Sequence, residues 1–565
     1  MNAEELLKSW CERLVKLQVR GYGAPHDGGF LCPACSAIHG RADNAFYPFM
    51  FLFGRTGDAA WLDAARAVFR WHSRVMLPNG AAYNDVNNLW TGTTTFSTIG
   101  YAKALIHCGE AMDADLRKQV EERLRVQAAW IFENLRVPAK IRTNINYAAA
   151  AGCVFALAGK TLGNEQYLAE ARRSFGYCLA HATDNGLIAG EGGSHDAASK
   201  RGCRYIDIGY NLEETIPCLA ELAHALGDKS FLRRISAVLR VHLDFMLPDG
   251  AIDNSNGTRN IKWTYYGSRT SDGCIGALTL LRDQDPVFRE AARRHFALLA
   301  ACSHDGMLYG GRRYRKIGLP PCTHHLLCHA VALADAIQYG FDSPDMDSRP
   351  LDLPCETPAI HCRAYPEFGA LKIAAGPFQA TITSSDASSQ AFRDGLSHPS
   401  GGTLALLHHH DLGAVIAGST YAYALSEPLN MQPPIGPLPH ATLLPRLEFT
   451  LAGRRYASCL ETDVTVESAV AEHCVTVNVR ADKFDISYTF GERTVGIDVA
   501  VHAGADARDP VFILPIVSGT CAVETRNASS TRDIYWIPGG FKAVEYTLRP
   551  NANGRFSATL RPPSA

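Results

Sequence analysis

The sequence lacks the signatures of several common protein classes. Its charges almost cancel, with 55 Lys and Arg residues against 57 Asp and Glu residues, so the overall charge does not favour nucleic acid or an anionic membrane as a partner. No stretch comes close to the roughly 18 to 20 consecutive apolar residues that a membrane helix needs. The Gly-x-Gly-x-x-Gly motif, the phosphate-binding loop and the Gly-x-Ser-x-Gly elbow are also missing, which leaves nucleotide chemistry and serine hydrolysis with little support.

The beginning of the chain and its cysteines bear on its location. The first ten residues, MNAEELLKSW, include Glu4 and Glu5 and do not have the basic head and apolar run of a signal peptide. The 17 cysteines are an odd number and are scattered without a dense framework. Several lie in apolar stretches, where reduced cysteine behaves as a small hydrophobic residue. We therefore expect a cytoplasmic protein that does not bind a membrane.

The two halves of the chain differ in the spacing of their apolar residues. A length of 565 residues exceeds what one hydrophobic core usually fills, so we expect at least two domains. Up to about residue 345, apolar residues recur every three or four positions, which is typical of helices. Beyond about residue 350 the period is two. Apolar and polar residues alternate over residues 484–490 and again over residues 495–499, after a short turn. This pattern predicts a β-hairpin.

A proline-rich segment separates these halves. Residues 343–354 contain four prolines and several aspartates, a composition typical of a linker. We therefore expect an α+β protein of two domains, with a helical domain over residues 1–345 and an antiparallel β-sandwich over residues 346–565.

The helical half contains a weak repeat. Pairs of Asn or Asp with Gly recur at Asp27-Gly28, Asn79-Gly80, Asn185-Gly186, Asp249-Gly250 and Asp305-Gly306. The gaps between them are 52, 106, 64 and 56 residues, so one repeat lacks its glycine, near residues 136–140. A unit of this length suits a helical hairpin with a long loop. Six such units predict an (α/α)6 toroid, with an extended solenoid of helix pairs as the alternative. A toroid would gather the polar loops after the turns at one mouth.

The densest candidate site is the stretch 253–274. It combines Trp263, Tyr265, Tyr266 and Arg269 with further polar residues. Aromatic faces suit sugar rings, and the guanidinium fork suits carboxylates or sulfates. The alternative is a long loop that packs its aromatic residues against the next helix.

A second stretch, residues 190–214, offers two kinds of catalytic group. His195 and Tyr210 would form an acid/base pair, whereas Glu191 with Glu214 would form the carboxylate pair of a hydrolase. Further upstream, Asn146 stands at the start of an Ala-rich helix, where an asparagine either caps the helix or binds substrate.

Other polar and aromatic residues extend the predicted substrate site. We expect substrate contacts from residues of the first, second and last repeats, namely His39, Arg41, Trp90, His324 and His325.

Two patterns raise the question of a metal. Cys32 and Cys35 form a Cys-x-x-Cys pair with His39 nearby, and His325 and His329 would share one face of a helix. A single Cys-x-x-Cys is a weak signal, and a satisfied buried histidine is more common than a ligand. The sequence therefore predicts no bound metal and no cofactor.

A helical toroid followed by a β-sandwich resembles the heparinase II/III-like and alginate-lyase-like enzymes. The matching residues are Asn144 and Asn146 at a helix entry, then Glu191 and His195, then Tyr210, because these lyases place an Asn, a His and a Tyr in the cleft in this order. The resemblance also implies a histidine from the β half, and His398 or His408 would supply it. Uronic-acid-specific glycoside hydrolases share this layout.

This resemblance implies a polysaccharide lyase that acts on uronate-containing glycans by β-elimination. The site must neutralise the uronate carboxylate before the C5 proton can leave, and Asn146 with Arg269 would do so. Tyr210 or His195 would accept the proton, and the other residue or Tyr266 would protonate the leaving oxygen. One alternative is an exo-acting β-glucuronidase, and another is a glycan-binding protein without activity. The large β half also offers a surface for a homodimer.

Overall fold

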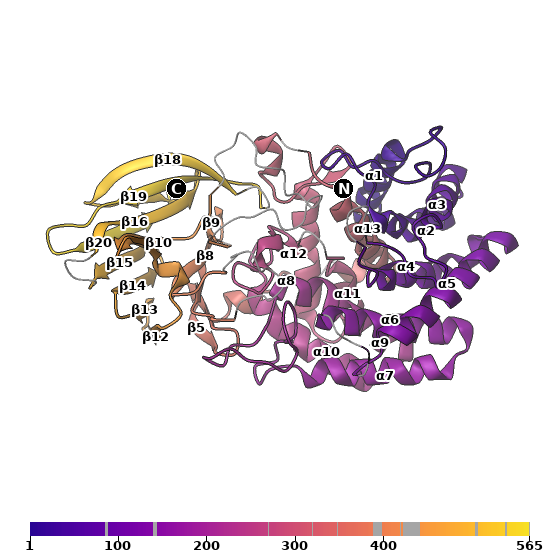
Figure 1. Cartoon of the computed structure of the whole chain (residues 1–565), viewed down its shortest axis with the longest axis horizontal. Helices are drawn as coiled ribbons and strands as arrows, with labels where there is room; N and C mark the ends of the chain where they lie inside the picture. The colour runs from indigo at the N-terminus through magenta and orange to yellow at the C-terminus, as the bar shows by residue number, and fades with distance from the viewer. Residues whose placement is uncertain are drawn as a thin grey trace.

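The chain contains a helical half and a β half that lie side by side (Figure 1). The computed structural model describes residues 1–84, 89–138, 140, 144–268, 271–318, 320–346, 349–387, 398–418, 420–421, 441–502, 507–536 and 539–563. The last long helix, α13 (Thr323–Gln338), precedes the first long strand, β5 (Ile360–Tyr365). The change from helix to strand therefore occurs within the proline-rich part of the sequence.

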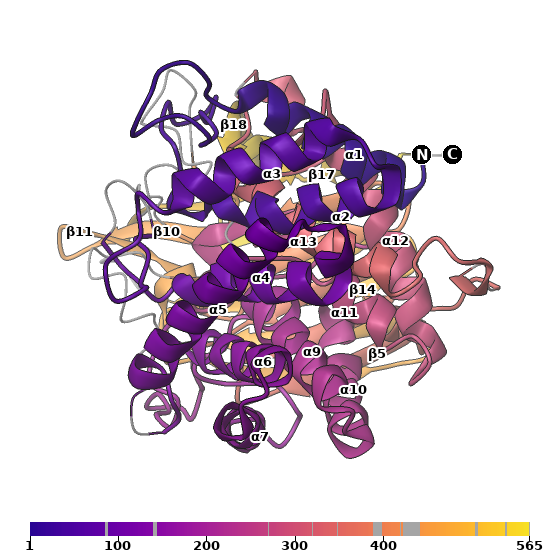
Figure 2. The same cartoon turned by 90° about the vertical axis from the view of Figure 1, so that its right-hand side faces the viewer.

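The helices form a closed double ring, which confirms the predicted toroid. Within the described residues the inner ring consists of α2 (Phe46–Thr56), α4 (Thr94–Cys108), α6 (Ile145–Leu162), α9 (Ile216–Leu226), α11 (Ile275–Leu280) and α13. Each contacts the next, and α13 contacts α2. The outer ring consists of α1 (Ala3–Leu17), α3 (Ala59–His72), α5 (Ala114–Asn134), α7 (Glu165–Ala180), α10 (Lys229–His242) and α12 (Pro286–Cys302), and it surrounds the inner helices in Figure 2.

The inner and outer helices differ in composition because they differ in burial. Outer helix α10 is amphipathic and buries one face, whereas inner helix α6 is apolar almost all round. Helix α6 has 18 residues with a mean hydropathy of 1.2, enough in length and composition to cross a membrane. It is 78% buried inside the protein, between α4, α7 and α9, as is typical of a central core helix.

The predicted Gly turns follow the outer helices and precede the long loops. Gly28, Gly80, Gly186, Gly250 and Gly306 have φ angles between 73° and 98°, a region that strongly favours glycine. Short antiparallel bridges flank these turns, as in Met76 with Ala82 and Met246 with Ile252.

These glycines also lie against the outer helix of the following repeat. A Cβ on Gly250 would lie 2.4 Å from the carbonyl oxygen of Arg294 in α12. A Cβ on Gly306 would lie 2.7 Å from the carbonyl oxygen of Ser9 in α1, so this contact joins the last repeat to the first. At Gly250 and Gly306, the close approach of the turn to the helix backbone therefore leaves room only for glycine.

The sixth turn, which lacks glycine, follows α5 as predicted. At this turn the sequence has no glycine to pack against the next outer helix. Instead, the backbone N–H of Val137 donates to Glu170 Oε1 of α7 at 3.2 Å. Glu170 is 1% exposed and also pairs with Arg173. A buried carboxylate thus makes the contact between repeats that glycine makes elsewhere.

Three antiparallel sheets form the β half within the described residues, which confirms the predicted sandwich-like arrangement. Their strand orders are β5-β6-β7-β8-β9, β11-β10-β16-β19-β18 and β12-β13-β14-β15-β20-β17. The strands of the first sheet are β5, β6 (Ala370–Ala375), β7 (Phe378–Thr383), β8 (Thr403–His409) and β9 (Gly413–Ala417). Those of the second are β10 (Arg446–Leu451), β11 (Arg454–Ala457), β16 (Arg508–Val517), β18 (Ala528–Trp536) and β19 (Phe541–Leu548). Those of the third are β12 (Thr465–Val470), β13 (Cys474–Arg480), β14 (Phe484–Gly491), β15 (Val495–Val501), β17 (Ala522–Glu524) and β20 (Arg555–Arg561).

Strands β14 and β15 are the hairpin expected from alternation. Phe484 pairs with Val501 and Phe490 with Val495, and the alternating apolar residues from Phe484 to Val499 are buried. Strands β5 and β6 pack against β12, β13 and β14, and β9 contacts β16. Apolar side chains from all three sheets therefore share one core, with Ile373 of the first sheet among them.

Buried contacts fasten the two halves together. Lys372 of β6 forms an ion pair of 2.6 Å with Asp253 of the helical half, and both side chains are almost completely buried. Phe541 of β19 packs against Trp263 and Tyr265, with ring centroids 5.9 and 5.7 Å apart. The loops at this end of the toroid therefore face the β half.

Replacing a turn glycine tests the packing between repeats. Gly250→Ala should lower the free energy of unfolding by about 2 kcal/mol or more, because it adds left-handed strain and a clash with α12. Thermal unfolding followed by circular dichroism would measure the shift. Gly176→Ala is the matched control, since an added Cβ there meets nothing within 4 Å in helix α7. It should stabilise slightly, and equal effects at both positions would contradict the packing role of Gly250.

Candidate active site

The loops that follow the six turns meet at one mouth of the toroid, as the sequence predicted. Each loop leads to the start of an inner helix, and side chains at these positions contact one another from repeat to repeat. The contacts that join the six loops are Trp90 with Tyr147, Asn144 with Glu191, Glu191 with Arg259, Arg41 with Asp272, and His39 with His324.

Tyr210 lies between two cations at this mouth. It ends the short helix α8 (Ile208–Tyr210), whose first turn is capped by Asp207. Lys262 Nζ donates to the Tyr210 hydroxyl at 3.2 Å, and the Arg259 guanidinium lies 4.1 Å from the centre of the Tyr210 ring. Arg259 and Lys262 therefore place positive charge beside the ring and the hydroxyl group of Tyr210.

Glu191 connects Arg259 to the entry of α6. Its Oε1 accepts hydrogen bonds from Arg259 at 2.7 Å and from Asn144 Nδ2 at 2.8 Å. Glu191 is fully buried, and burial raises the pKa of its carboxyl group to about 7 in spite of the nearby Arg259. This pairing holds the Arg259 guanidinium in place, while 14% of the Arg259 side chain remains exposed.

A second buried carboxylate, that of Glu214, lies beside Asn146. Asn146 Nδ2 donates to Glu214 Oε2, and both residues are nearly inaccessible to solvent. Burial and then the negative charge of Asp272 raise the pKa of Glu214 to about 8, although Arg41 opposes this shift. Arg41 itself forms an ion pair with Asp272. A protonated Glu214 at neutral pH would donate rather than only accept a hydrogen bond.

The backbone between Tyr210 and Glu214 departs from a regular helix. Residues Asn211–Thr215 form a π-helical turn between α8 and α9. Such turns recur at functional sites because they change which face of a helix presents a side chain. Here the turn places Tyr210 beside Arg259 and Glu214 beside Asn146.

Comparison with known proteins identifies the family. Residues 7–354 match the profile of the ulvan lyase N-terminal domain, and residues 362–534 match that of the ulvan lyase C-terminal domain. A broad-specificity ulvan lyase from Formosa agariphila is 31% identical over 534 residues, which cover 91% of this chain and 82% of the relative. This chain belongs to the ulvan lyase family.

The fold is shared with a structurally characterised lyase. A chondroitin AC lyase from Streptomyces coelicolor A3 superimposes with a TM-score of 0.55 and 12% sequence identity, over 100% of this chain and 80% of that one. At this identity the likeness concerns the fold alone.

The family assignment decides between the chemical alternatives. The protein is a polysaccharide lyase, which breaks its substrate by elimination rather than by hydrolysis. The β-glucuronidase alternative finds no support. Glu191 and Glu214 are therefore better explained by their hydrogen bonds to Arg259 and Asn146 than as the acid and nucleophile of a glycosidase.

The structure places the other predicted catalytic residues of the lyase in different settings. The Tyr177 hydroxyl and His195 Nδ1 are 2.7 Å apart, and the His195 ring lies 5.5 Å from that of His181. His195 therefore stands beside outer helix α7, whereas Tyr210 stands beside Arg259. Arg269 lies outside the described residues.

The predicted aromatic residues of the lyase divide into two groups. Trp263 is fully buried and donates from Nε1 to the Ile252 carbonyl at 2.7 Å, and the Tyr265 hydroxyl donates to Asp249 at 2.6 Å. These two side chains pack at the junction with the β half, in line with the alternative of a loop packed by its aromatic residues. Trp90, by contrast, is 40% exposed at the rim of the mouth.

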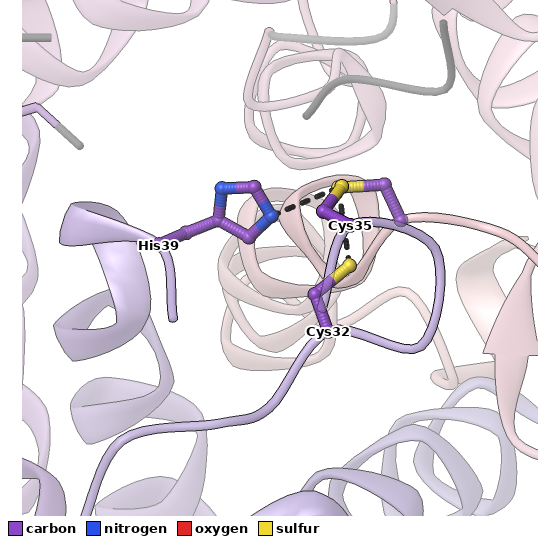
Figure 3. A group of neighbouring side chains, drawn as sticks. Cys32, Cys35 and His39 are labelled. Carbon is purple, nitrogen blue, oxygen red and sulfur yellow. Dashed lines mark hydrogen bonds between the residues drawn. The ribbon is translucent and has the colours of Figure 1, made fainter. Parts of the chain in front are cut away.

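The histidines predicted to bind substrate are buried. His325 hydrogen-bonds the hydroxyl of Tyr266, and neither side chain is exposed. His324 is 4% exposed, and its ring lies 5.6 Å from that of His39. His39 in turn lies beside a group of cysteines, where Figure 3 shows it with Cys32 and Cys35.

The two histidines of the β half also differ in their surroundings. His408 of β8 is fully buried, and its Nε2 lies 3.5 Å from Asp249 Oδ1 at the domain junction. His398 is 9% exposed, and burial lowers its pKa to about 4.

Sequence reasoning did not single out Arg259 and Lys262 as partners of Tyr210. Both belong to the polar stretch 253–274, so the signal was their positive charge within an aromatic segment. Their proximity to Tyr210, about fifty residues earlier in the chain, depends on the ring that brings the fourth and fifth loops together.

The raised pKa of Glu214 predicts how stability depends on pH. Because the pKa of this group is about 8 in the folded protein and near 4.5 when exposed, its contribution to stability is fully present below about pH 4.5 and is lost as pH rises to about 8. Glu214→Gln keeps a hydrogen-bond acceptor for Asn146 and carries no charge. We expect the melting temperature of Glu214→Gln to rise relative to the wild type between pH 5 and pH 8, as followed by differential scanning fluorimetry. Parallel pH profiles for the two proteins would contradict the assignment.

Proposed function

We propose that this lyase cleaves ulvan, or a closely similar uronate polysaccharide, with Tyr210 as the residue that removes the C5 proton. The substrate class is supported by the family and by the printed activity of the relative from Formosa agariphila. The role of Tyr210 is supported by its hydroxyl group, which accepts a hydrogen bond from Lys262 at the meeting point of the loops.

Elimination requires the uronate carboxylate to be neutralised. A carboxylate next to C5 resists the negative charge that develops when the proton leaves, so the site must supply positive charge or hydrogen-bond donors. Arg259, whose guanidinium lies beside the Tyr210 ring and whose side chain is 14% exposed, provides the charge. Asn146 would add a neutral donor, and the raised pKa of Glu214, which accepts from Asn146 Nδ2, favours a neutral carboxyl group beside it. The sequence suggested Asn146 and Arg269 for this role. Arg269 lies outside the described residues, so we extend the hypothesis to Arg259.

The bond changes follow from this arrangement. The Tyr210 phenolate accepts the C5 proton, and the electrons of the C–H bond form the C4=C5 double bond while the C4–O bond breaks. The leaving oxygen then takes a proton, which we propose comes from the newly protonated Tyr210 hydroxyl. Lys262 stabilises the phenolate before the reaction and again after this transfer.

The surroundings of the site suit an anionic chain. The inner helices begin at this mouth, so the positive ends of the longer ones, such as α6 and α13, point towards it. Trp90 at the rim offers an exposed aromatic face to a sugar ring. Binding would therefore combine favourable charge with stacking.

A substrate panel tests the proposed specificity. Ulvan should give rising near-ultraviolet absorbance from the unsaturated uronate, together with new chain ends measured as reducing sugar. Absorbance on another polyuronate but not on ulvan would contradict the substrate while leaving the elimination chemistry intact.

Tyr210→Phe tests the catalytic assignment. Loss of the hydroxyl should lower kcat by about 10²- to 10⁴-fold, because proton transfer by a positioned group contributes this much. Binding of ulvan, measured by isothermal titration calorimetry, should change little. Tyr546→Phe on β19 is the control for removing a tyrosine hydroxyl elsewhere. Normal turnover by Tyr210→Phe, with loss of turnover in His195→Ala, would transfer the role to His195.

Lys262→Met tests the electrostatic role of the neighbouring cation. The acidic limb of the pH–rate profile should move to higher pH, since the proposed phenolate loses the positive charge that donates to its oxygen. We expect kcat at neutral pH to fall about tenfold or more. A fall in kcat without any shift of the profile would indicate that Lys262 only supports the local structure.

A further inference from the structure

We propose that Cys32, Cys35, His39 and Cys322 bind one zinc ion that joins the first and last repeats of the toroid. The sequence suggested only a weak Cys-x-x-Cys signal and led us to expect no metal. The fold adds the decisive fourth residue, Cys322, from nearly 300 positions further along the chain.

The donor atoms have the spacing of a tetrahedral metal site. One donor atom from each of the four residues lies within 4.8 Å of every other. Cys322 Sγ lies 3.7 Å from both Cys32 Sγ and Cys35 Sγ, and 3.2 Å from His39 Nε2. Zinc–sulfur bonds of about 2.3 Å at tetrahedral angles require sulfur atoms about 3.8 Å apart. The three distances from Cys322 Sγ are thus close to the edges of a zinc-centred tetrahedron, and the other donor atoms lie within 4.8 Å of one another.

This spacing does not suit a disulfide. A disulfide needs a sulfur–sulfur distance of about 2.05 Å, and each cysteine can form only one. Cys322 is equally far from Cys32 and Cys35, so neither is its preferred partner. Figure 3 shows the side chains of Cys32, Cys35 and His39 converging on one point from the same loop.

The backbone around the sulfur atoms is arranged for thiolates. The N–H groups of Thr323 and His324 point at Cys32 Sγ and Cys322 Sγ at 3.4 and 3.5 Å. The loop between the first two cysteines is a tight turn, in which the Ser36 N–H donates to the Cys32 carbonyl at 2.9 Å. Cys322 also caps the N-terminus of α13, where the helix dipole favours negative charge. Donors of this kind stabilise metal-bound sulfur and fix its orientation.

The site is closed, which indicates a structural rather than a catalytic metal. Cys32, His39 and Cys322 are at most 1% exposed, and Cys35 is half-buried. Three thiolates and one imidazole complete a tetrahedral shell and leave no position for substrate or water. Zinc prefers this donor set because it accepts both sulfur and nitrogen without a redox change.

The position of the site explains what the metal would do. The site connects the loop after α1 to the start of α13. A metal there would therefore stabilise the contact between the first and last repeats of the ring. His39 lies two residues before Arg41, which pairs with Asp272 at the mouth, and Cys322 lies two residues before His324. The zinc would therefore fix the relative position of two of the six loops, independently of which polysaccharide the mouth accepts.

Metal analysis of the purified full-length protein tests the inference. Inductively coupled plasma mass spectrometry should find about one zinc ion per chain. Cys32→Ser and Cys322→Ser should each lose most of the metal and lower the melting temperature. Cys474→Ser, a half-buried cysteine of β13 outside the group, should retain both.

A second measurement covers the case in which these variants do not fold. Wild-type protein grown with cobalt should show the intense near-ultraviolet thiolate-to-cobalt absorption and the visible bands of a tetrahedral site. Protein that is isolated without metal, with free thiols at Cys32 and Cys322 or with a disulfide that joins Cys322 to Cys32 or Cys35 in peptide mass spectra, would overturn the proposal. Full zinc retention by Cys322→Ser would do so as well.

Discussion

Closure of the helical ring is the constraint on which the rest of the structure depends. Inner helices such as α6 are apolar on nearly every side and are stable only when neighbours cover them. An open solenoid would leave the first and last of them uncovered, whereas contact between α13 and α2 buries both. Closure in turn brings six loops to one mouth, so the candidate active site is a consequence of burying the inner helices.

Two buried carboxylates with raised pKa values lie at the mouth. Glu191 and Glu214 are buried, and burial raises their pKa values to about 7 and about 8. Each accepts a hydrogen bond from a neighbouring loop or helix. Such groups are costly in a hydrophobic core, and their pKa values near neutrality are typical of functional sites. Their cost is offset by Arg259 and Asn146, which hold them in place, and by the ring that fixes these partners.

Particular elements show how far the sequence could predict the fold. The hairpin of β14 and β15 and the turn at Gly250 follow from short-range patterns, in which alternation or a positive φ angle decides the local structure. The number of repeats followed from the spacing of the turns. The packing role of Trp263 could not be predicted, because an aromatic residue in a polar loop suits a sugar or a neighbouring domain equally well.

The sequence by itself determined the two kinds of secondary structure, the repeat length and the residue types available for chemistry, since these depend on local periodicity and composition. Only the tertiary structure decided which of those residues meet. Tyr210 with Lys262, and Cys322 with Cys32, are far apart in the chain and share no local pattern. Their contact arises because ring closure brings distant loops to one place, and no short-range rule encodes that distance.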